Sequence, residues 1–404
     1  MARKDLGRKP DELDLLLSPS RGLLGAGDDD EASLRNPEVQ ERFRAHIATK
    51  LAKWDKQYAG SSAREDARKR RIEELGIILL DCRKLREGIT SVRRADSFAV
   101  EAYESSALLS LYASNDPQLS SSLPPLVHSL HPPIDVDKTR SGGTGSQDSL
   151  DASLSRLSLN TTSPDPATRA YFIALHLLHS HLLPAFTTPV QPSTPSAVAS
   201  SHSPLSTFLP SLFSLLRASS LPPPTALYPA PSHPDAHIAH LLSLYHALLH
   251  ASSASLSTLL SPSRLPRTPP HVAGLLAYLH LPATFHPYAA LLRSAAPKLR
   301  EHALWPAVRR AYRFPPDPTA WLAKGLLFEF EVEMEEREKE GEAGGAGGVG
   351  DVRKGGGRTE VSDSWEDDDG LEQEGEEKTG REVRLRAEAE RRAAIWVKER
   401  LPAR

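Results

Sequence analysis

The sequence predicts a mostly α-helical protein: an irregular helical-repeat array with long disordered inserts, and with a winged-helix-like C-terminal end as a further option. Two observations predict this class. In several stretches apolar residues recur every three or four positions, which is the period of an amphipathic helix. The 34 Pro and 24 Gly of the 404 residues cluster between these stretches, where they interrupt regular structure. We therefore expect helical bodies separated by inserts.

Charge and cysteine content narrow the function classes. With 49 Lys and Arg against 52 Asp and Glu, the formal net charge is -3, so no overall field attracts nucleic acid or an anionic membrane. A lone cysteine, Cys82, forms neither an internal disulfide nor a thiolate zinc cage, which indicates the cytoplasm, the nucleus or both. Neither a signal-peptide region nor a membrane span is expected, because the most apolar run, 171–183, is short and contains three histidines.

The first predicted helix has clear start signals. Residues 1–35 lack periodicity and are predicted to be a disordered leader, and the N-terminal helical region, 36–133, follows. Asn36 is a suitable N-cap, and Pro37 suits the first turn. The residues after them that share one apolar stripe are Val39, Phe43, Ile47, Leu51, Trp54 and Tyr58.

Two more helices and a shorter segment complete this region. Asp96 is predicted to cap the third helix, whose two apolar sides suggest burial on both faces. Gly88 is expected to help end the second helix, and a segment over 123–130 should end at Pro132. The apolar face of the second helix comprises Ile72, Leu75, Leu79, Cys82, Leu85 and Ile89.

The rest of the chain alternates between low-complexity and helical patterns. A Ser/Thr/Gly/Asp composition predicts a disordered linker over 134–166. Helical periodicity then resumes in a helical-repeat or winged-helix-like region, 167–335, whose helices are bounded by prolines and in which Pro306 should cause a kink. An acidic, Gly-rich disordered segment is predicted over 336–380. A basic C-terminal element, 381–404, is either a returning helix or a closing strand.

No residue combination predicts catalysis. Cys82 lies on an apolar stripe and is interpreted as a buried structural cysteine, although the neighbouring Arg83 and Lys84 leave a reactive thiolate as the alternative. Three histidine pairs share helix faces, but no carboxylate lies between their members, as it does in a zinc hydrolase motif. We predict no catalytic, cofactor-binding or metal-binding residues. The pairs are His176 and His179, His237 and His240, and His246 and His250.

A cluster of basic residues forms the one candidate interaction surface. Acidic residues are interspersed among them, so a solvated helix face with intrahelical ion pairs is the first interpretation. Contact with a phosphate backbone or an acidic partner is the alternative. The basic residues concerned are Arg68, Lys69, Arg70, Arg71, Arg83, Lys84, Arg86, Arg93 and Arg94.

Three segments carry a family resemblance. The stretches 81–90 (DCRKLREGIT) and 94–104 (RADSFAVEAYE), and a second block at 299–304 (LREHAL) with Arg310 to Tyr312, resemble parts of fungal proteins. Those proteins contain the PCI-like helical domain shared by a small COP9 signalosome subunit, a proteasome lid subunit and the k subunit of a translation initiation factor. More distantly, the segments resemble the Sac/GANP mRNA-export scaffolds. The resemblance implies a helical-repeat and winged-helix module that joins multi-subunit complexes and has no active site.

The leading hypothesis is therefore a non-enzymatic scaffold or adaptor subunit that binds protein subunits of a larger complex. Its disordered segments would be tethers or phosphorylation sites, for example at Ser163-Pro164 and Ser203-Pro204. The alternative is an RNA- or DNA-associated factor that uses the Arg68–Arg94 surface. An enzyme ranks third, since it would need His176, His179 and a distant carboxylate to converge. We expect neither membrane binding nor a small-molecule substrate.

Overall fold

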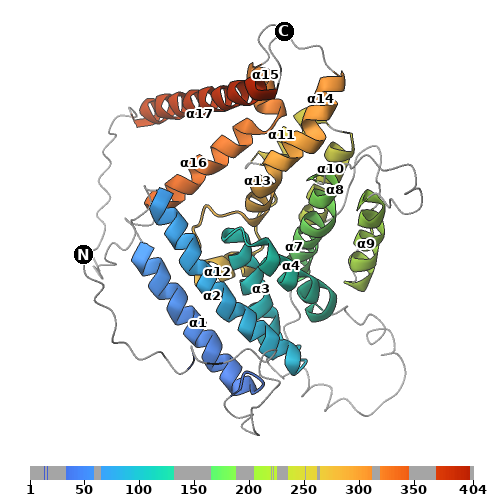
Figure 1. Ribbon diagram of the computed structural model, residues 1–404, viewed down its shortest axis with the longest axis vertical. Coiled ribbons are helices and arrows are strands. Elements are labelled where there is room, and N and C mark those ends of the chain that lie inside the picture. Colours follow the sequence, from blue (N-terminus) through green and yellow to red (C-terminus); the bar gives the residue numbers. More distant parts are fainter. Residues whose placement is uncertain are drawn as a thin grey trace, which may run out of the picture.

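The computed structural model describes residues 33–58, 65–131, 165–187, 204–219, 235–250, 252–261, 264–311, 319–344 and 370–400, with isolated positions at 13, 16, 221, 223 and 224. These residues are mostly helical and include no β-strand, which confirms the predicted fold class (Figure 1). Most of the predicted leader and linker, both Ser-Pro serines and residues 345–369 lie outside the described residues.

The helices follow one another in this order: α1 (Pro37–Tyr58), α2 (Glu65–Ser91), α3 (Ser97–Tyr112), α4 (Asp116–Pro125), α7 (Pro166–Leu177), α8 (Leu183–Thr187), α9 (Pro204–Ala218), α10 (Ala236–Leu249), α11 (Ser253–Leu260), α12 (Pro270–Tyr278), α13 (Pro287–Leu299), α14 (Trp305–Ala311), α15 (Thr319–Gly325), α16 (Phe328–Gly344) and α17 (Gly370–Arg400). Three π-helical turns lie between them: η3 (Leu126–Leu130), η4 (Leu178–Leu182) and η5 (Arg300–Leu304).

Helices α1 and α2 form an antiparallel hairpin along one edge of the molecule (Figure 1). The Trp54 indole donates to the Arg71 carbonyl at 2.9 Å, and Lys50 pairs with Asp81 at 2.6 Å. Trp54, near the end of α1, thus contacts the beginning of α2, whereas Lys50, one turn earlier on α1, contacts a residue further along α2. The two helices therefore run in opposite directions. The apolar stripe predicted for α1 is buried from Val39 to Trp54, and the Asn36 side chain caps the helix as predicted, accepting from the Glu38 amide.

Helix α3 lies inside the fold and packs against α2, α4 and α13. Its Asp96 side chain caps the first turn by accepting from the Ala99 amide at 3.0 Å, as predicted. Nearly all residues from Phe98 to Leu111 are buried, which confirms burial on both faces. Small residues permit this close packing. The hydrogen-bonding requirement of the buried Ser110 hydroxyl is met within the helix, because the hydroxyl donates to the Ser106 carbonyl. Helix α3 therefore joins the N-terminal hairpin to the helices that follow.

Gly88 does not end α2, which continues to Ser91. A Cβ atom at Gly88 would lie 2.6 Å from the carbonyl oxygen of Leu34. The glycine therefore allows the segment before α1 to press against α2, and its role is close packing rather than helix termination. The preceding segment is held there by Gln40, whose side-chain amide donates to the same Leu34 carbonyl at 2.8 Å.

Prolines interrupt the helices less than the sequence rules predict. Pro124 and Pro125 both lie within α4, and the chain continues helically through η3 to Leu130. Likewise α13 continues through η5 into α14, so that a π-helical turn directly precedes the turn containing Pro306. A π-helical turn changes the hydrogen-bond register, so it accommodates residues that lack an amide hydrogen.

The two predicted helical regions share one hydrophobic core. Helix α13 contacts α3 from the N-terminal region, as well as α8 and α16. Between α7, α10 and α13, the buried ring of Tyr171 packs edge-on against Phe172, His237 and Tyr288 at centroid distances of 5.1–5.4 Å. Aromatic rings prefer this edge-to-face arrangement.

The C-terminal helix α17 lies along α15 and α16 (Figure 1). Its Trp396 ring packs edge-on against Trp305 at 5.2 Å, and Arg392 makes two contacts of 2.8 and 2.9 Å with Glu335 on α16. Helix α16 extends to Gly344 and α17 begins at Gly370, so both helices reach into the segment for which composition predicts disorder. Described residues 381–400 are helical, so they supply no closing strand for a winged helix.

Candidate functional site

The basic residues of the predicted interaction surface do not form one continuous surface. Arg68, Lys69 and Arg70 are exposed near the start of α2, whereas Arg93 is exposed beyond the other end of that helix. About 20 residues of helix separate Arg70 from Arg93, which corresponds to about 30 Å along the helix axis. Arg83 pairs with Glu87 at 2.7 Å and Lys84 with Asp81 at 3.4 Å, in the intrahelical manner of the first interpretation.

Arg71, Arg86 and Arg94 make contacts within the fold and do not project freely into solvent. The Arg71 guanidinium stacks over Trp54, 4.7 Å from the ring centroid. The buried Arg86 donates to the Gln118 side-chain oxygen at 2.7 Å and to the Ser121 hydroxyl at 3.0 Å, which ties α2 to α4. Arg86 was expected on the solvated face of α2, but it is buried because residues of α4 cover that part of the helix.

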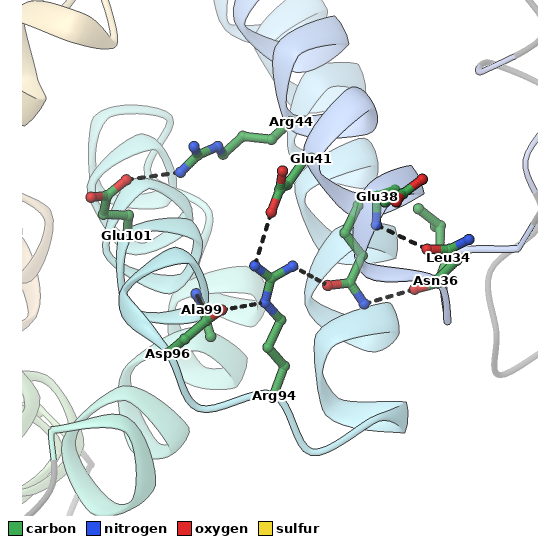
Figure 2. A network of polar contacts seen from close by, with 10 residues as sticks. Leu34, Asn36, Glu38, Glu41, Arg44, Arg94, Asp96, Ala99 and Glu101 are labelled. Atoms are coloured by element: carbon green, nitrogen blue, oxygen red, sulfur yellow. Dashed lines mark hydrogen bonds and ion pairs between the residues drawn. The ribbon is translucent and has the colours of Figure 1, made fainter. Parts of the chain in front are cut away.

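Arg94 is the centre of a polar network at the junction of α1, α2 and α3 (Figure 2). Its guanidinium donates to Asp96 at 2.7 Å, to the Gln40 side-chain oxygen at 3.1 Å and to Glu41 at 3.2 Å. It also lies over the Phe98 ring, 4.0 Å from the centroid. One side chain therefore fixes the start of α1 relative to the N-cap of α3. Whether the exposed basic residues bind a partner remains a prediction.

Cys82 is buried, as predicted, between α2 and its neighbours. Burial raises the pKa of its thiol to about 12, despite the favourable charge of Arg86. At neutral pH the side chain is therefore a protonated thiol, which is a poor nucleophile.

Of the paired histidines, His176, His237 and His240 are buried, whereas His179 and His246 are partly exposed and His250 is exposed. Burial lowers the pKa of His176 to about 3, assisted by the nearby His128, and lowers the pKa of both His237 and His240 to about 4. The His237 ring stacks on Tyr288 at 5.9 Å, and His240 meets the same ring edge-on at 6.1 Å. Among the described residues, no three His, Cys, Asp or Glu side chains lie close enough together to hold a metal ion.

A buried carboxylate, which sequence analysis did not single out, joins distant parts of the chain. Glu104 on α3 accepts from His131 Nε2 at 3.2 Å and from His271 Nε2 at 2.8 Å. The Glu104 and His131 side chains are fully buried, whereas that of His271 is half-exposed. Burial acts to raise the pKa of Glu104, but the hydrogen bonds from both histidines outweigh it and the pKa is lowered. In turn, the hydrogen bond to Glu104 raises the pKa of His271.

Next to the contact between His271 and Glu104, a pocket of about 440 Å³ lies between α1, α2, α3 and α12. Two ion pairs lie at its edge: Arg44 with Glu101 at 2.8 Å, both of which line the pocket, and the lining His271 with the fully buried Glu104 at 2.8 Å. Apolar side chains from all four helices form most of the remaining wall, and those concerned include Ile47, Leu51, Leu85, Leu109, Leu275 and Leu279. The size lies within the usual range for binding sites of small molecules.

The outward face of α2 carries two exposed aliphatic side chains. Ile77 and Leu80 are 61% and 53% exposed, although they lie one helical turn apart on a long, regular helix. Gly76 beside them has no atom within 4 Å of the position where a Cβ would lie. We call Glu73, Gly76, Ile77, Leu80 and Lys84 the α2 ridge. Two neighbouring exposed aliphatic side chains next to a glycine form a surface that another helix can approach closely.

Comparison with known proteins found no match among protein-family models, curated proteins or solved structures. The resemblance of residues 81–90 and 94–104 to PCI-like proteins therefore remains a prediction. None of the described helices has the length and apolar character needed to cross a membrane.

Proposed function

We propose that this chain is a non-enzymatic adaptor subunit that docks onto a helical protein partner through the α2 ridge, within a larger cytoplasmic or nuclear assembly. The exposure of Ile77 and Leu80 carries this proposal. Apart from the partly exposed Ile72, the other large aliphatic side chains of α2 are buried, as Leu75, Leu79 and Leu85 are. Exposed aliphatic pairs at helical spacing are typical of helix-in-groove and helix-on-helix recognition.

The charges around the ridge indicate the chemistry of the partner. Glu73 lies exposed on the N-terminal side of Ile77, and the side chain of Lys84 is about a quarter exposed on the C-terminal side of Leu80. A partner helix packed antiparallel to α2 would therefore complement it best with an acidic residue facing Lys84 and a basic residue facing Glu73. Such charges select the partner and its direction, and the central aliphatic pair supplies most of the affinity.

The resemblance in the sequence supports the same assignment. Two of its stretches, 81–90 and 94–104, lie mostly on α2 and α3, and proteins with PCI-like domains are subunits of multi-protein assemblies. We accordingly propose a complex of that type, comparable to a signalosome, proteasome lid, initiation factor or mRNA-export scaffold. RNA or DNA binding through the exposed Arg68, Lys69 and Arg70 is the competing proposal, and it predicts affinity that falls steeply with salt.

Affinity purification of the tagged chain from its native cells, with and without nuclease, tests the proposal. We expect a stoichiometric set of protein partners that withstands nuclease and is lost from an Ile77→Asp/Leu80→Asp variant, since two buried carboxylates would oppose docking. Because both side chains are exposed in the free chain, the variant should fold normally.

A matched variant controls for the added charge. Val383→Asp/Ile395→Asp places the same substitution at two exposed positions of α17, which are 63% and 51% exposed, and it should retain the partners. Partners recovered equally with the α2 variant would contradict docking at the ridge. Partners that disappear on nuclease treatment would instead support the nucleic-acid alternative.

A further inference from the structure

The pocket between α1, α2, α3 and α12, which we call the α12 pocket, has features of a ligand site that the adaptor function does not require. Its volume of about 440 Å³ is that of a cavity for a small organic molecule. Its wall is mostly aliphatic, so a bound molecule gains free energy chiefly by removing apolar surface from water. Ligand binding there would be a property of the free chain and does not depend on the adaptor function.

The charges at the rim indicate a neutral ligand. Arg44 is paired with Glu101, and His271 is paired with Glu104, each with an N–O distance of 2.8 Å. A charged ligand that drew Arg44 away would deprive Glu101 of its ion-pair partner, and one that drew His271 away would take from the fully buried Glu104 one of its two hydrogen bonds, the other being from His131. Weakening a buried ion pair in this way is costly. A neutral molecule leaves both pairs intact.

One polar group in the wall is available for a ligand. The Ser105 hydroxyl lines the pocket and makes no hydrogen bond to the described residues. The next residue, Ser106, is not available to a ligand in this pocket, because it is buried in the interior and does not line the pocket. A hydroxyl can donate or accept, so Ser105 suits a ligand with a single neutral hydrogen-bonding group.

Helix α12 closes the pocket and is attached at both ends by histidine–carboxylate contacts. His271 in its first turn binds Glu104 on α3, and His280 just beyond its last turn lies 3.3 Å from Asp55 on α1. Between them, Leu275 contributes to the pocket wall, and the adjacent Gly274, which also lines the pocket, leaves open space, since a Cβ there would have no atom within 4 Å. The glycine thus enlarges the cavity at the middle of α12.

We propose that the α12 pocket binds a small, neutral, predominantly apolar organic molecule that makes one hydrogen bond with Ser105. The molecule would contact α1, α2, α3 and α12 together, so its binding would stabilise the attachment of α12 to the N-terminal hairpin. Ligand binding would then couple to the position of a helix rather than to a chemical reaction.

Fluorescence titration of the full chain tests this directly. The probe is N-phenyl-1-naphthylamine, a neutral fluorophore whose emission rises in apolar surroundings. We expect saturable binding with one site per chain. The matched anionic probe, 1-anilinonaphthalene-8-sulfonate, has the same ring system with an added sulfonate, and it should bind at least tenfold more weakly. Equal or tighter binding of the anionic probe would overturn the assignment of a neutral ligand.

Two glycine substitutions locate the site. Gly274→Phe directs a ring into the open space of the pocket and should weaken the neutral probe at least tenfold. Gly76→Phe adds the same ring to α2, where the space is also open but lies outside the pocket, and it should bind like the parent chain. Both substitutions replace glycine within a helix, which favours folding; circular dichroism verifies this. Ala48→Phe, on the α1 side of the pocket, is the second blocking variant if Gly274→Phe does not fold. Absence of saturable binding in the parent chain, or equal binding by the blocking variant, would overturn the proposal.

Discussion

Acidification is expected to destabilise this protein strongly, because its core contains histidines that are neutral in the folded state. Burial holds the pKa of His176 at about 3 and the pKa of both His237 and His240 at about 4. The ordinary value in an unfolded chain is about 6.5. Below pH 6.5 the unfolded chain therefore takes up protons that the folded chain does not, and stability falls until the folded pKa is reached.

The size of the effect follows from the same values. At pH 5 each of the three histidines costs about 2 kcal/mol relative to pH 8, so together they cost about 6 kcal/mol. The buried Glu104 and its partner His271 do not add to this loss of stability. The raised pKa of His271 contributes stability that is fully present below pH 6.5, and the lowered pKa of Glu104 contributes stability that is present above pH 4.5. A loss of about 6 kcal/mol is comparable to the whole stability of many domains.

Urea unfolding monitored by far-UV circular dichroism at pH 8, 7, 6 and 5 measures this dependence. His237→Phe keeps the ring stacked on Tyr288 but removes one titrating group, so the slope between pH 6 and 5 should fall by about 1.2 kcal/mol per pH unit. Tyr245→Phe on the same helix removes no histidine and is the control. A free energy of unfolding that stays constant from pH 8 to 5, or an unchanged slope in His237→Phe, would refute the reasoning.

Three substitutions, the last of them with a control at Gly76, test the packing. Glu104→Gln should lower the free energy of unfolding by about 2–3 kcal/mol in urea titrations, because it removes the charge that both histidines contact; a loss below 0.5 kcal/mol would contradict a structural role. Arg94→Ala should cost about 2 kcal/mol through the lost network and the lost contact with Phe98, and normal stability would show that the network is dispensable. Gly88→Ala should cost about 2 kcal/mol because its Cβ would meet a backbone oxygen, whereas Gly76→Ala should stabilise by about 0.5–1 kcal/mol; equal thermal unfolding temperatures would contradict the close approach at Gly88.

Local signals made the N-terminal helices predictable. Asn36 and Asp96 are recognisable caps because the bonds they make are to amides two or three residues away. The buried stripe of α1 is likewise visible from spacing alone. By contrast, composition did not reveal the helical parts of 336–344 and 370–380, because the aromatic contacts that hold α17 come from Trp305 and Phe328 far away in the chain.

The candidate sites depend on contacts between distant residues, which sequence spacing does not reveal. Arg86 was placed with the solvated cations, but its partner Gln118 is 32 residues away, on a helix that covers it. Glu104 and His271 are separated by 167 residues, so nothing in the sequence links them or announces the pocket beside them. The exposure of Ile77 and Leu80 was equally hidden, since aliphatic residues on two faces of α2 predict burial as readily as docking.

Site-specific photo-crosslinking in the native cell tests most directly whether the α2 ridge docks onto a protein partner. The photoreactive residue p-benzoylphenylalanine replaces Leu80, and in a control chain it replaces the exposed Val383 of α17. The adaptor account predicts one discrete covalent adduct from position 80, formed with a different, helical protein, and no such adduct from position 383. No adduct at position 80, or adducts only with nucleic acid or with a second copy of this chain, would contradict it.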